Sequence, residues 1–342
     1  MLGALKRRLL PNGLVPFFRR YGGARLFDVL YETGARLYGR RLRLDASSVC
    51  QLKCPACSTA SGVNRRGVIG AGHLKPEDFR RLVEGAGDIK MIELSNWGEI
   101  FLNPGLNDIM RTAHEHGIAL IAMNGVNLNT VSPEQLEGLV KYRFHALSVS
   151  IDGASAETYA RYRVGGDFER VLANLREINR LKKKYKSPFP KLHWQFIIFG
   201  HNEHELPAAR KTARALGMKF RPKLNHTPDL FPVRDRDFVR KESGFGAADR
   251  REYRANNSTH YSYPCGQMWS NPQVNWDGKL LGCCVNKYGD FGNVFETGLR
   301  AGLRSEKYRY AKAMVLGRKP PREDIPCYKC KTYWKLNPRA TR

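Results

Sequence analysis

Eight cysteines are the residues of this 342-residue sequence whose type and spacing could do chemistry. The first three, Cys50, Cys54 and Cys57, form a Cys-x3-Cys-x2-Cys pattern, and Pro55 favours a loop there over a helix. Three thiolates in one loop can hold a metal centre and leave one iron of a four-iron cluster free to chelate a small molecule. A structural zinc site would need a fourth ligand, and the nearest histidine in the sequence is His73.

Four of the other cysteines form a second set near the C-terminal end of the sequence. Cys265 and Cys283 flank a hairpin predicted at residues 272–284, and Cys327 and Cys330 form a Cys-x2-Cys pair. Four thiolates in this arrangement suit either a fully ligated four-iron cluster or a zinc site. The residues alone leave both open.

Strands that alternate with helices must position these cysteines. Short apolar strands are predicted at residues 41–46, 90–95, 118–123, 146–151, 191–199 and 218–224, with helices between them. This alternation implies a parallel sheet with right-handed crossovers, and six units suit a partial barrel better than a full eight-stranded one. In such sheets the chemistry gathers at the carboxyl ends of the strands, and the first cysteine set directly follows the first strand.

The composition is that of a basic globular protein. There are 58 Lys and Arg against 32 Asp and Glu, a formal net charge of +26. Because 42% of the residues are hydrophobic, a disordered polycation is excluded. The first 45 and the last 42 residues together hold 22 of the basic residues but six of the acidic ones, which suggests contact with something anionic. No nucleic-acid-binding motif is present, so nucleic acid is not an expected partner.

The N-terminal segment, residues 1–40, interleaves Leu, Phe and Tyr with Arg at loosely helical spacing. We expect an amphipathic extension packed on its own domain, and a helix lying on an anionic membrane surface is the alternative. No apolar run is long enough for a transmembrane helix, and Pro11, Asn12 and Gly13 interrupt the pattern of a secretory signal. The expected compartment is the cytoplasm, at the membrane periphery in the alternative case, where cysteines serve as metal or catalytic thiols rather than disulfides.

A cysteine loop after the first strand of a partial barrel resembles the radical S-adenosylmethionine (radical SAM) superfamily. Further motifs carry the resemblance, each at or just past the end of a predicted strand. They are Trp97-Gly98-Glu99, Asn124-Gly125, the segment Ser148 to Gly153, Arg163 and Asn202. The resemblance implies that Cys50, Cys54 and Cys57 hold a 4Fe-4S cluster whose open iron binds S-adenosylmethionine. It further implies cofactor contacts from Gly98, Glu99, Asn124, Ser150, Asp152, Arg163 and Asn202.

Two residues depart from the family pattern. Ala56 precedes the third cysteine, where the family usually has an aromatic residue, so the expected packing over the adenine is looser. Trp97 replaces the first glycine of the family's Gly-Gly-Glu motif, and we expect it to reshape the methionine pocket.

The C-terminal residues, 265–342, resemble the auxiliary-cluster extension called SPASM, and more closely its short form, the twitch domain. The resemblance implies one auxiliary iron–sulfur cluster, expected to be 4Fe-4S, on Cys265, Cys283, Cys327 and Cys330. The expected fold class is therefore α/β, a partial (β/α)6 TIM barrel with a small C-terminal twitch/SPASM-like extension. The expected domains are the extension at 1–40, the barrel at 41–224, a linker or substrate-region segment at 225–264 and the cluster domain at 265–342.

Cys284 is left over from both sets. Neighbouring residues of a strand point to opposite faces, so if Cys283 faces the cluster then Cys284 faces away. A free cysteine is commonly a buried apolar thiol. The alternative is a catalytic hydrogen-atom donor to a substrate radical, as in radical epimerases, although nothing local marks the thiol as reactive.

The resemblance implies a radical SAM oxidoreductase or epimerase. The reduced cluster would cleave S-adenosylmethionine to a 5′-deoxyadenosyl radical that abstracts a hydrogen atom from the substrate. The single auxiliary cluster and the charge favour a small, anionic, sugar- or nucleotide-like metabolite, oxidised or epimerised. An electron donor such as flavodoxin or ferredoxin is the implied protein partner.

Two alternatives to this function stay open. One is radical modification of a ribosomally made peptide or protein by crosslinking, epimerisation or maturation. The other is a non-enzymatic zinc-binding module on an anionic polymer. Metal content distinguishes the zinc module from the enzyme. The zinc module would be colourless, whereas two four-iron clusters would give a brown protein with about eight iron atoms.

Overall fold

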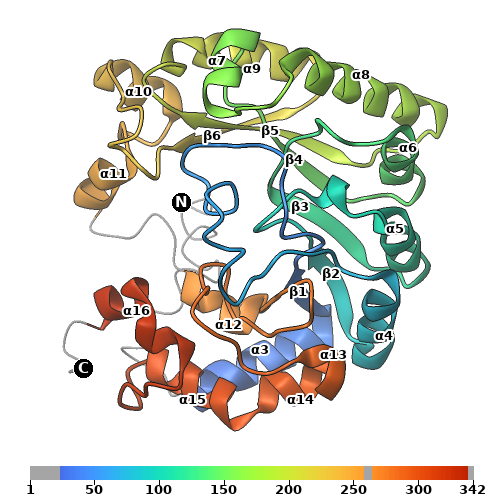
Figure 1. Ribbon diagram of the computed structural model, residues 1–342, viewed down its shortest axis with the longest axis vertical. Coiled ribbons are helices and arrows are strands. Elements are labelled where there is room, and N and C mark those ends of the chain that lie inside the picture. Colours follow the sequence, from blue (N-terminus) through green and yellow to red (C-terminus); the bar gives the residue numbers. More distant parts are fainter. Residues whose placement is uncertain (1–23, 258–263, 338–342) are drawn as a thin grey trace.

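The computed structural model describes residues 24–257 and 264–337, and a curved parallel sheet lies at its centre (Figure 1). Within those residues, the strand order is β6-β5-β4-β3-β2-β1-β7, and every neighbouring pair is parallel. The strands are β1 (Arg40–Leu44), β2 (Ile89–Glu93), β3 (Ala119–Val126), β4 (Ala146–Ser150), β5 (Lys191–Ile198), β6 (Lys219–Leu224) and β7 (Gln273–Val274). The sheet does not close on itself, which confirms the partial barrel.

Helices cover the outer face of the sheet between successive strands (Figure 1). They are α4 (Pro76–Ala86), α5 (Leu106–Glu115), α6 (Pro133–Lys141), α7 (Ala156–Tyr162), α8 (Phe168–Lys184) and α9 (Leu206–Ala215). Local sequence sets their starts: Ser132 and Gln135 form a capping box at α6, and the Asp167 side chain accepts from Arg170 N at the start of α8. Each helix thus carries the chain back to begin the next parallel strand.

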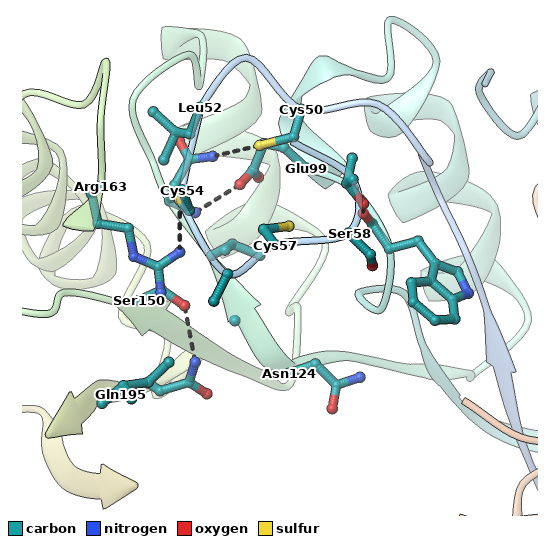
Figure 2. Close-up of a pocket in the computed structure, with 18 of the residues that line it drawn as sticks. Cys50, Leu52, Cys54, Cys57, Ser58, Glu99, Asn124, Ser150, Arg163 and Gln195 are labelled. Atoms are coloured by element: carbon teal, nitrogen blue, oxygen red, sulfur yellow. Dashed lines mark hydrogen bonds between the residues drawn. The ribbon is translucent and has the colours of Figure 1, made fainter. Parts of the chain in front are cut away.

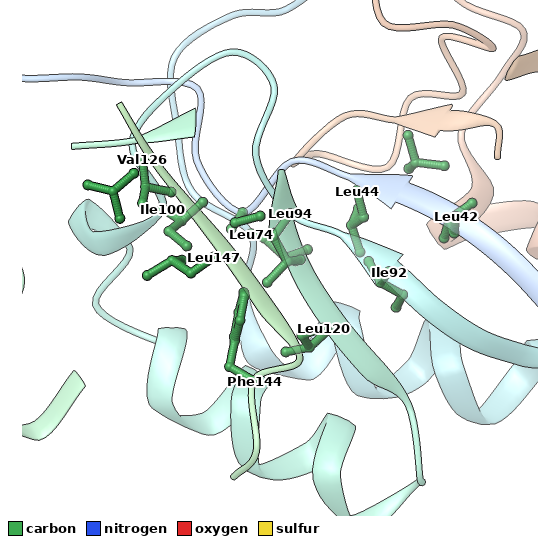
Figure 3. Packing of buried hydrophobic residues seen from close by; sticks show 14 of the residues in the cluster. Leu42, Leu44, Leu74, Ile92, Leu94, Ile100, Leu120, Val126, Phe144 and Leu147 are labelled. Carbon is green, nitrogen blue, oxygen red and sulfur yellow. The ribbon is translucent and has the colours of Figure 1, made fainter. Parts of the chain in front are cut away.

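Alternate strand residues divide between the helical face and the concave face of the sheet. Leu42, Leu44, Ile92, Leu120 and Leu147 are nearly or fully buried and pack together on the helical side (Figure 3). The residues between them therefore point into the hollow of the partial barrel. This parity decides which strand side chains can reach a ligand there.

The C-terminal part extends the sheet and packs beside it. Gly278, with φ 87°, makes the turn expected in the hairpin, and Val274 forms an antiparallel bridge with Leu280. The two-residue strand β7 also pairs in parallel with β1, which the sequence did not predict. The helical stretch at residues 299–315 is divided at Ser305, whose side chain caps the second half. The helices of this part are α12 (Gln267–Ser270), α13 (Val294–Thr297), α14 (Leu299–Arg304), α15 (Glu306–Val315) and α16 (Lys331–Leu336).

The segment expected to be a linker with little core, residues 225–264, contains two helices where it is described. These are α10 (Arg236–Ser243) and α11 (Arg250–Asn257). Ion pairs join them, because Glu252 accepts from Arg236 at 2.6 Å and from Arg240 at 2.6 Å. The polar composition that suggested a linker therefore reflects helices held by surface charge more than by apolar burial.

Helix α3 (Ala24–Tyr38) is the described part of the basic N-terminal segment, and residues 1–23 lie outside the described residues. It contacts β1 and α12, and Glu32 on α3 accepts from Arg40 at 3.0 Å. Val29, Leu30, Leu37 and Tyr38 are exposed. Among the residues that the structure describes, no helix has the length and apolar character needed to cross a membrane.

Candidate active site

The first cysteine set lies in an irregular loop between β1 and α4 (Figure 2). Cys57 N donates to Cys54 O at 3.1 Å, and Lys53 N donates to Val164 O at 2.9 Å, which ties the loop to the end of α7. Cys50, Cys54 and Cys57 all line one cavity of about 300 Å³ at the carboxyl ends of the strands. The structure therefore brings together the three thiols that the sequence singled out.

Burial makes these thiols reluctant to ionise before a metal binds. It raises the pKa of Cys50 to about 12, with the carboxylate of Glu99 adding to the effect. The pKa of Cys54 is raised by burial too, although the guanidinium of Arg163 opposes it. Ligation must therefore release protons, as metal binding to thiols generally does.

Glu99 lies past the end of β2 and is 2% exposed. Its carboxylate accepts from Asn127 N at 2.7 Å and from Phe101 N at 3.3 Å. Burial raises the pKa of Glu99 to about 7, although these backbone bonds lower it. Gly98 permits the arrangement, because a Cβ there would lie 2.6 Å from Val49 O in the cysteine loop. Glu99 can thus accept hydrogen bonds from a cationic group held beside the cysteines.

Arg163 reaches the same cavity from the end of α7. It pairs with Asp152, which is fully buried, at 2.6 Å, and its Nη1 donates to Cys54 Sγ at 3.7 Å. Burial disfavours the charged guanidinium, but Asp152 and Cys54 outweigh it and raise the pKa of Arg163 above its ordinary value. The arginine therefore stays charged beside the cysteine loop.

Ser150 and Asn124 line the cavity from β4 and β3, as the sequence suggested. Gln195 on β5, which the sequence analysis missed, donates to Ser150 Oγ at 3.1 Å (Figure 2). Its Oε1 is buried with no hydrogen-bond partner among the described residues. A buried acceptor of this kind is satisfied when a ligand donates to it. Strand parity alone could have found Gln195, because it faces the same side as Ile197, which also lines the cavity.

Two rings lie beside the residue that departs from the family pattern. Tyr162 at the end of α7 and His226 after β6 both line the cavity with Ala56. His226 also hydrogen-bonds the backbone of Ala56. Trp97 lines the cavity as well, and its indole Nε1 is buried with no hydrogen-bond partner among the described residues. Tyr162 and His226 thus supply, from other elements, ring surface of the kind that Ala56 lacks.

Asp152 and Asn202 are not among the residues that line the cavity. Asn202 is fully buried, and its Nδ2 donates to Asp152 O and Ile197 O, both at 3.0 Å. It therefore ties the end of β4 to the end of β5. Asp152 acts on the cavity through Arg163.

The second cysteine set converges on a separate cavity in the C-terminal part. Cys265, Cys283, Cys327 and Cys330 all line it, with apolar Met268 among their neighbours. Burial raises the pKa of Cys265, Cys283 and Cys327, and neighbouring thiols add to it in each case. Four thiols held together under burial suit a fully ligated cluster.

Cys284 does not line that cavity, although its neighbour Cys283 does. Its N–H donates to Gln267 Oε1 at 2.8 Å, and its carbonyl accepts from Asn96 Nδ2 at 3.2 Å. The backbone of Cys284 thus joins the cluster domain to the loop after β2. Whether its thiol reacts stays a prediction.

Two family models match the chain, and each contains one of the cysteine sets. The radical SAM superfamily model matches residues 46–212, and the iron–sulfur cluster-binding domain SPASM matches residues 265–331. The chain therefore contains a radical SAM domain and a SPASM domain. Its cofactors are accordingly a 4Fe-4S cluster and S-adenosylmethionine, with auxiliary iron–sulfur binding in the SPASM domain.

Known proteins resemble the chain in sequence or in fold. The chain is 31% identical to the AdoMet-dependent heme synthase of Methanosarcina barkeri (strain Fusaro / DSM 804). The aligned 181 residues make up 52% of this chain. The match spans about half, 48%, of that relative's length. Among solved structures, SuiB of Streptococcus suis bound to S-adenosylmethionine superposes with a TM-score of 0.62 at 14% identity, over 90% of this chain and 74% of SuiB. The structure of native anSMEcpe with bound AdoMet gives 0.56 at 17% identity, over 86% and 87% of the two chains.

The residues present fit the family's cofactors. Three thiols, a buried acid and an unpaired Gln195 acceptor line the first cavity, and four buried thiols line the second. Among the described residues, no three His, Cys, Asp or Glu side chains converge closely enough to hold a single metal ion. Cysteines of a four-iron cluster bind different irons and so surround the cluster. Cys50, Cys54 and Cys57 would hold the first cluster, and Cys265, Cys283, Cys327 and Cys330 the auxiliary one.

Proposed function

We propose that this radical SAM enzyme takes a hydrogen atom from a small, anionic, sugar- or nucleotide-like metabolite and oxidises or epimerises it. One observation carries the proposal. A second cavity, of about 780 Å³, lies on the concave side of the sheet and shares Asn124 with the cofactor cavity. Its walls come from β1, β2, β3, β6, α3 and α12, so a molecule bound there borders the cofactor.

The chain's own residues bind and orient, while the bound cofactor supplies the hydrogen-abstracting radical. Glu99 offers a buried acceptor in the cofactor cavity, and Gln195 Oε1 offers another. Arg163 is fixed by Asp152 and stays charged beside Cys54.

The charge of the larger cavity favours an anionic substrate. Arg41, Arg43, Arg221 and Lys223 line it. Among the described residues that line it, Glu93 is the one acidic residue. Its carboxylate is buried and accepts hydrogen bonds from Ser95 and Met123. The field inside the hollow is therefore positive, which concentrates anions there.

The position of the cavity suits both proposed outcomes. Its α12 wall begins two residues after Cys265, so an oxidised substrate would lie close to the auxiliary cluster as electron acceptor. For epimerisation, the backbone of Cys284 bonds to Asn96 and Gln267, which line the cofactor cavity and the larger cavity respectively. This position of Cys284 between the two cavities supports it as the candidate hydrogen-atom donor.

A second candidate comes from the relative named as a heme synthase. Tetrapyrroles of that kind carry carboxylates, and the cationic lining of the cavity suits such groups as well. The peptide alternative differs, because a ribosomally made peptide need not carry clustered negative charge.

The experiment is an anaerobic assay of the iron-loaded protein with a reductant and S-adenosylmethionine. Phosphorylated sugars, sugar nucleotides, a carboxylated porphyrin and unrelated peptides are added in separate reactions. We expect an anionic metabolite to raise 5′-deoxyadenosine formation at least tenfold, and deuterium from the labelled metabolite to appear in that product. Stimulation by a peptide alone would overturn the proposal.

The same assay in deuterated water separates the two outcomes. An epimerase incorporates one solvent deuterium through an exchangeable thiol, and Cys284→Ala abolishes the incorporation. An oxidase incorporates none. Normal turnover by Cys284→Ala, with deuterium still incorporated, would contradict the thiol donor.

A further inference from the structure

The concave cavity carries cations near the two ends of the open sheet, on the edge strand β6 and on β1, the strand next to β7. β6 and β1 are separated by four strands of the sheet (Figure 1). Side chains of both strands nevertheless line the same cavity. β6 contributes Arg221 and Lys223, and β1 contributes Arg41 and Arg43. The curvature of the sheet thus places two positive walls across one hollow.

The β6 wall has cations without a carboxylate to pair with. Arg221 Nη1 is buried and has no hydrogen-bond partner among the described residues. Burial lowers the pKa of Lys223 to about 8, and the charges of Arg221 and Arg250 add to the effect. Asp152 is near enough to act on Lys223, but it is already paired with Arg163.

The β1 wall has the same deficit at Arg41 and a smaller one at Arg43. Arg41 is exposed to the cavity and forms no ion pair with a described residue. Arg43 is buried and donates to two neutral acceptors, Gln273 Oε1 at 2.9 Å and Asn96 Oδ1 at 3.4 Å. It forms no ion pair with a described residue, although its charge opposes the rise that burial causes in the pKa of the carboxyls of Glu93 and Asp45. The contrast is Arg40, whose guanidinium is paired with carboxylates on α3 and before β2.

Unpaired cations facing one another across a half-buried hollow cost free energy unless an anion compensates them. Guanidinium groups match carboxylate and phosphate oxygens in geometry as well as charge. We propose, building on the function proposed above, that the substrate carries two anionic groups and spans the hollow. Arg221 and Lys223 bind one group, and Arg41 with Arg43 behind it binds the other. The body of the molecule between them borders the cofactor cavity at Asn124.

The experiment uses the iron-loaded protein with S-adenosylmethionine present and measures binding by calorimetry. The probes are linear dicarboxylates from succinate to sebacate, and pyrophosphate and longer bisphosphonates, each compared with acetate or inorganic phosphate. One dianion of suitable length binds at least tenfold more tightly than its monoanion, because its second group binds intramolecularly. The two series distinguish carboxylate from phosphate as the preferred group.

Charge-matched variants assign the two subsites. Arg221→Gln/Lys223→Gln and, separately, Arg41→Gln reduce the preference for the dianion to less than threefold. The control Lys211→Gln/Arg214→Gln also removes one lysine and one arginine charge, but from the exposed outer side of α9. It should keep the preference for the dianion. Because Arg41 is exposed, Arg41→Gln keeps the test valid even where the double variant fails to fold.

The pH dependence of dianion binding tests the β6 subsite independently. Lys223 faces Arg221, Arg250, Asp152 and Arg163, and its pKa is lowered to about 8. Binding of the dianion therefore weakens as pH rises above about 8, where Lys223 loses its charge, and Lys223→Met removes this dependence.

Either of two results would overturn the inference. They are equal affinity for dianions and monoanions at every length, or an equal loss in the α9 control. Such a protein could still cleave S-adenosylmethionine in response to a substrate with one anionic group, which would leave the proposed function standing. Tight binding of a dianion without any cofactor cleavage would instead refute the proposed function and keep the two subsites.

Discussion

The two cysteine sites of this molecule differ in what surrounds their thiols. The barrel site has three cysteines in an irregular loop, beside a cavity of about 300 Å³ lined also by Glu99, Arg163 and other polar side chains. The C-terminal site has four cysteines in a cavity lined mainly by buried and apolar neighbours. The barrel site has an open volume and polar side chains that can bind a ligand. At the C-terminal site, a fourth thiol completes the ligand set.

The difference shows how one chain can assign two tasks to the same chemical group. An open ligand position beside polar groups suits binding and activation of a small molecule, whereas a closed thiol cage suits electron storage. Polar groups at the barrel site also cost stability when they lose their partners. Variants should therefore affect the two sites in different ways.

The largest effect is expected from Cys50→Ala/Cys54→Ala/Cys57→Ala. Loss of these thiols removes the cluster that binds S-adenosylmethionine, so 5′-deoxyadenosine formation should fall by at least about a thousandfold. Iron should fall from about eight to about four atoms per chain, since the auxiliary site keeps its ligands. Iron and sulfide analysis alongside the cleavage assay checks both. Unchanged iron would show that the loop holds no cluster.

The next effect separates two adjacent cysteines of the C-terminal site. Cys283 lines the cluster cavity and Cys284 does not. Cys283→Ala should therefore lose the auxiliary cluster, about four iron atoms, whereas Cys284→Ala should keep it. Iron analysis of the two purified variants makes the comparison. Equal iron loss would place both thiols at the cluster.

A smaller effect is expected from the buried ion pair of the barrel site. Arg163→Met leaves the fully buried Asp152 without its ion-pair partner, although Ile197 N still donates to it at 2.6 Å, and should cost about 3 kcal/mol of unfolding free energy. The control is Arg180→Met, which removes an exposed pair with Glu177 and should leave the unfolding free energy nearly unchanged. Urea denaturation of the two variants, prepared anaerobically, measures the difference. Similar losses would mean that Asp152 has another compensating partner.

The smallest effect concerns the close approach beside Glu99. A Cβ at position 98 would lie 2.6 Å from Val49 O, so Gly98→Ala must displace the cysteine loop or Glu99. Overpacking of this size costs about 1 to 3 kcal/mol, and we expect weaker binding of S-adenosylmethionine by about tenfold with auxiliary iron unchanged. Gly85→Ala is the control, because nothing lies within 4 Å of a Cβ there. Undiminished cofactor affinity in Gly98→Ala would show that the loop adapts freely.

Much of the barrel could be predicted from the sequence because its signals are local. Apolar runs gave six strands, and the cysteine spacing and the motifs after each strand gave the cofactor cavity. The SPASM match and the four-thiol cavity agree with the resemblance seen in the C-terminal cysteines. These features depend on residues close together in the chain.

The rest depends on contacts between distant segments. The strand β7 has two residues, too few for a pattern to reveal that it pairs with β1. Arg41 and Arg221 are 180 positions apart in sequence, and only the curvature of the sheet brings them to one cavity. His226 was missed for the same reason, since its position beside Ala56 follows from the path of the loop after β6.

The most direct test of the comparison is electron paramagnetic resonance of the reduced protein with and without S-adenosylmethionine. Two variants isolate the sites: one lacks Cys265, Cys283, Cys327 and Cys330, and the other lacks Cys50, Cys54 and Cys57. We predict that S-adenosylmethionine changes the cluster signal of the first variant and leaves that of the second unchanged. A shift in the second variant, or none in the first, would contradict the assignment of the open site to the barrel loop.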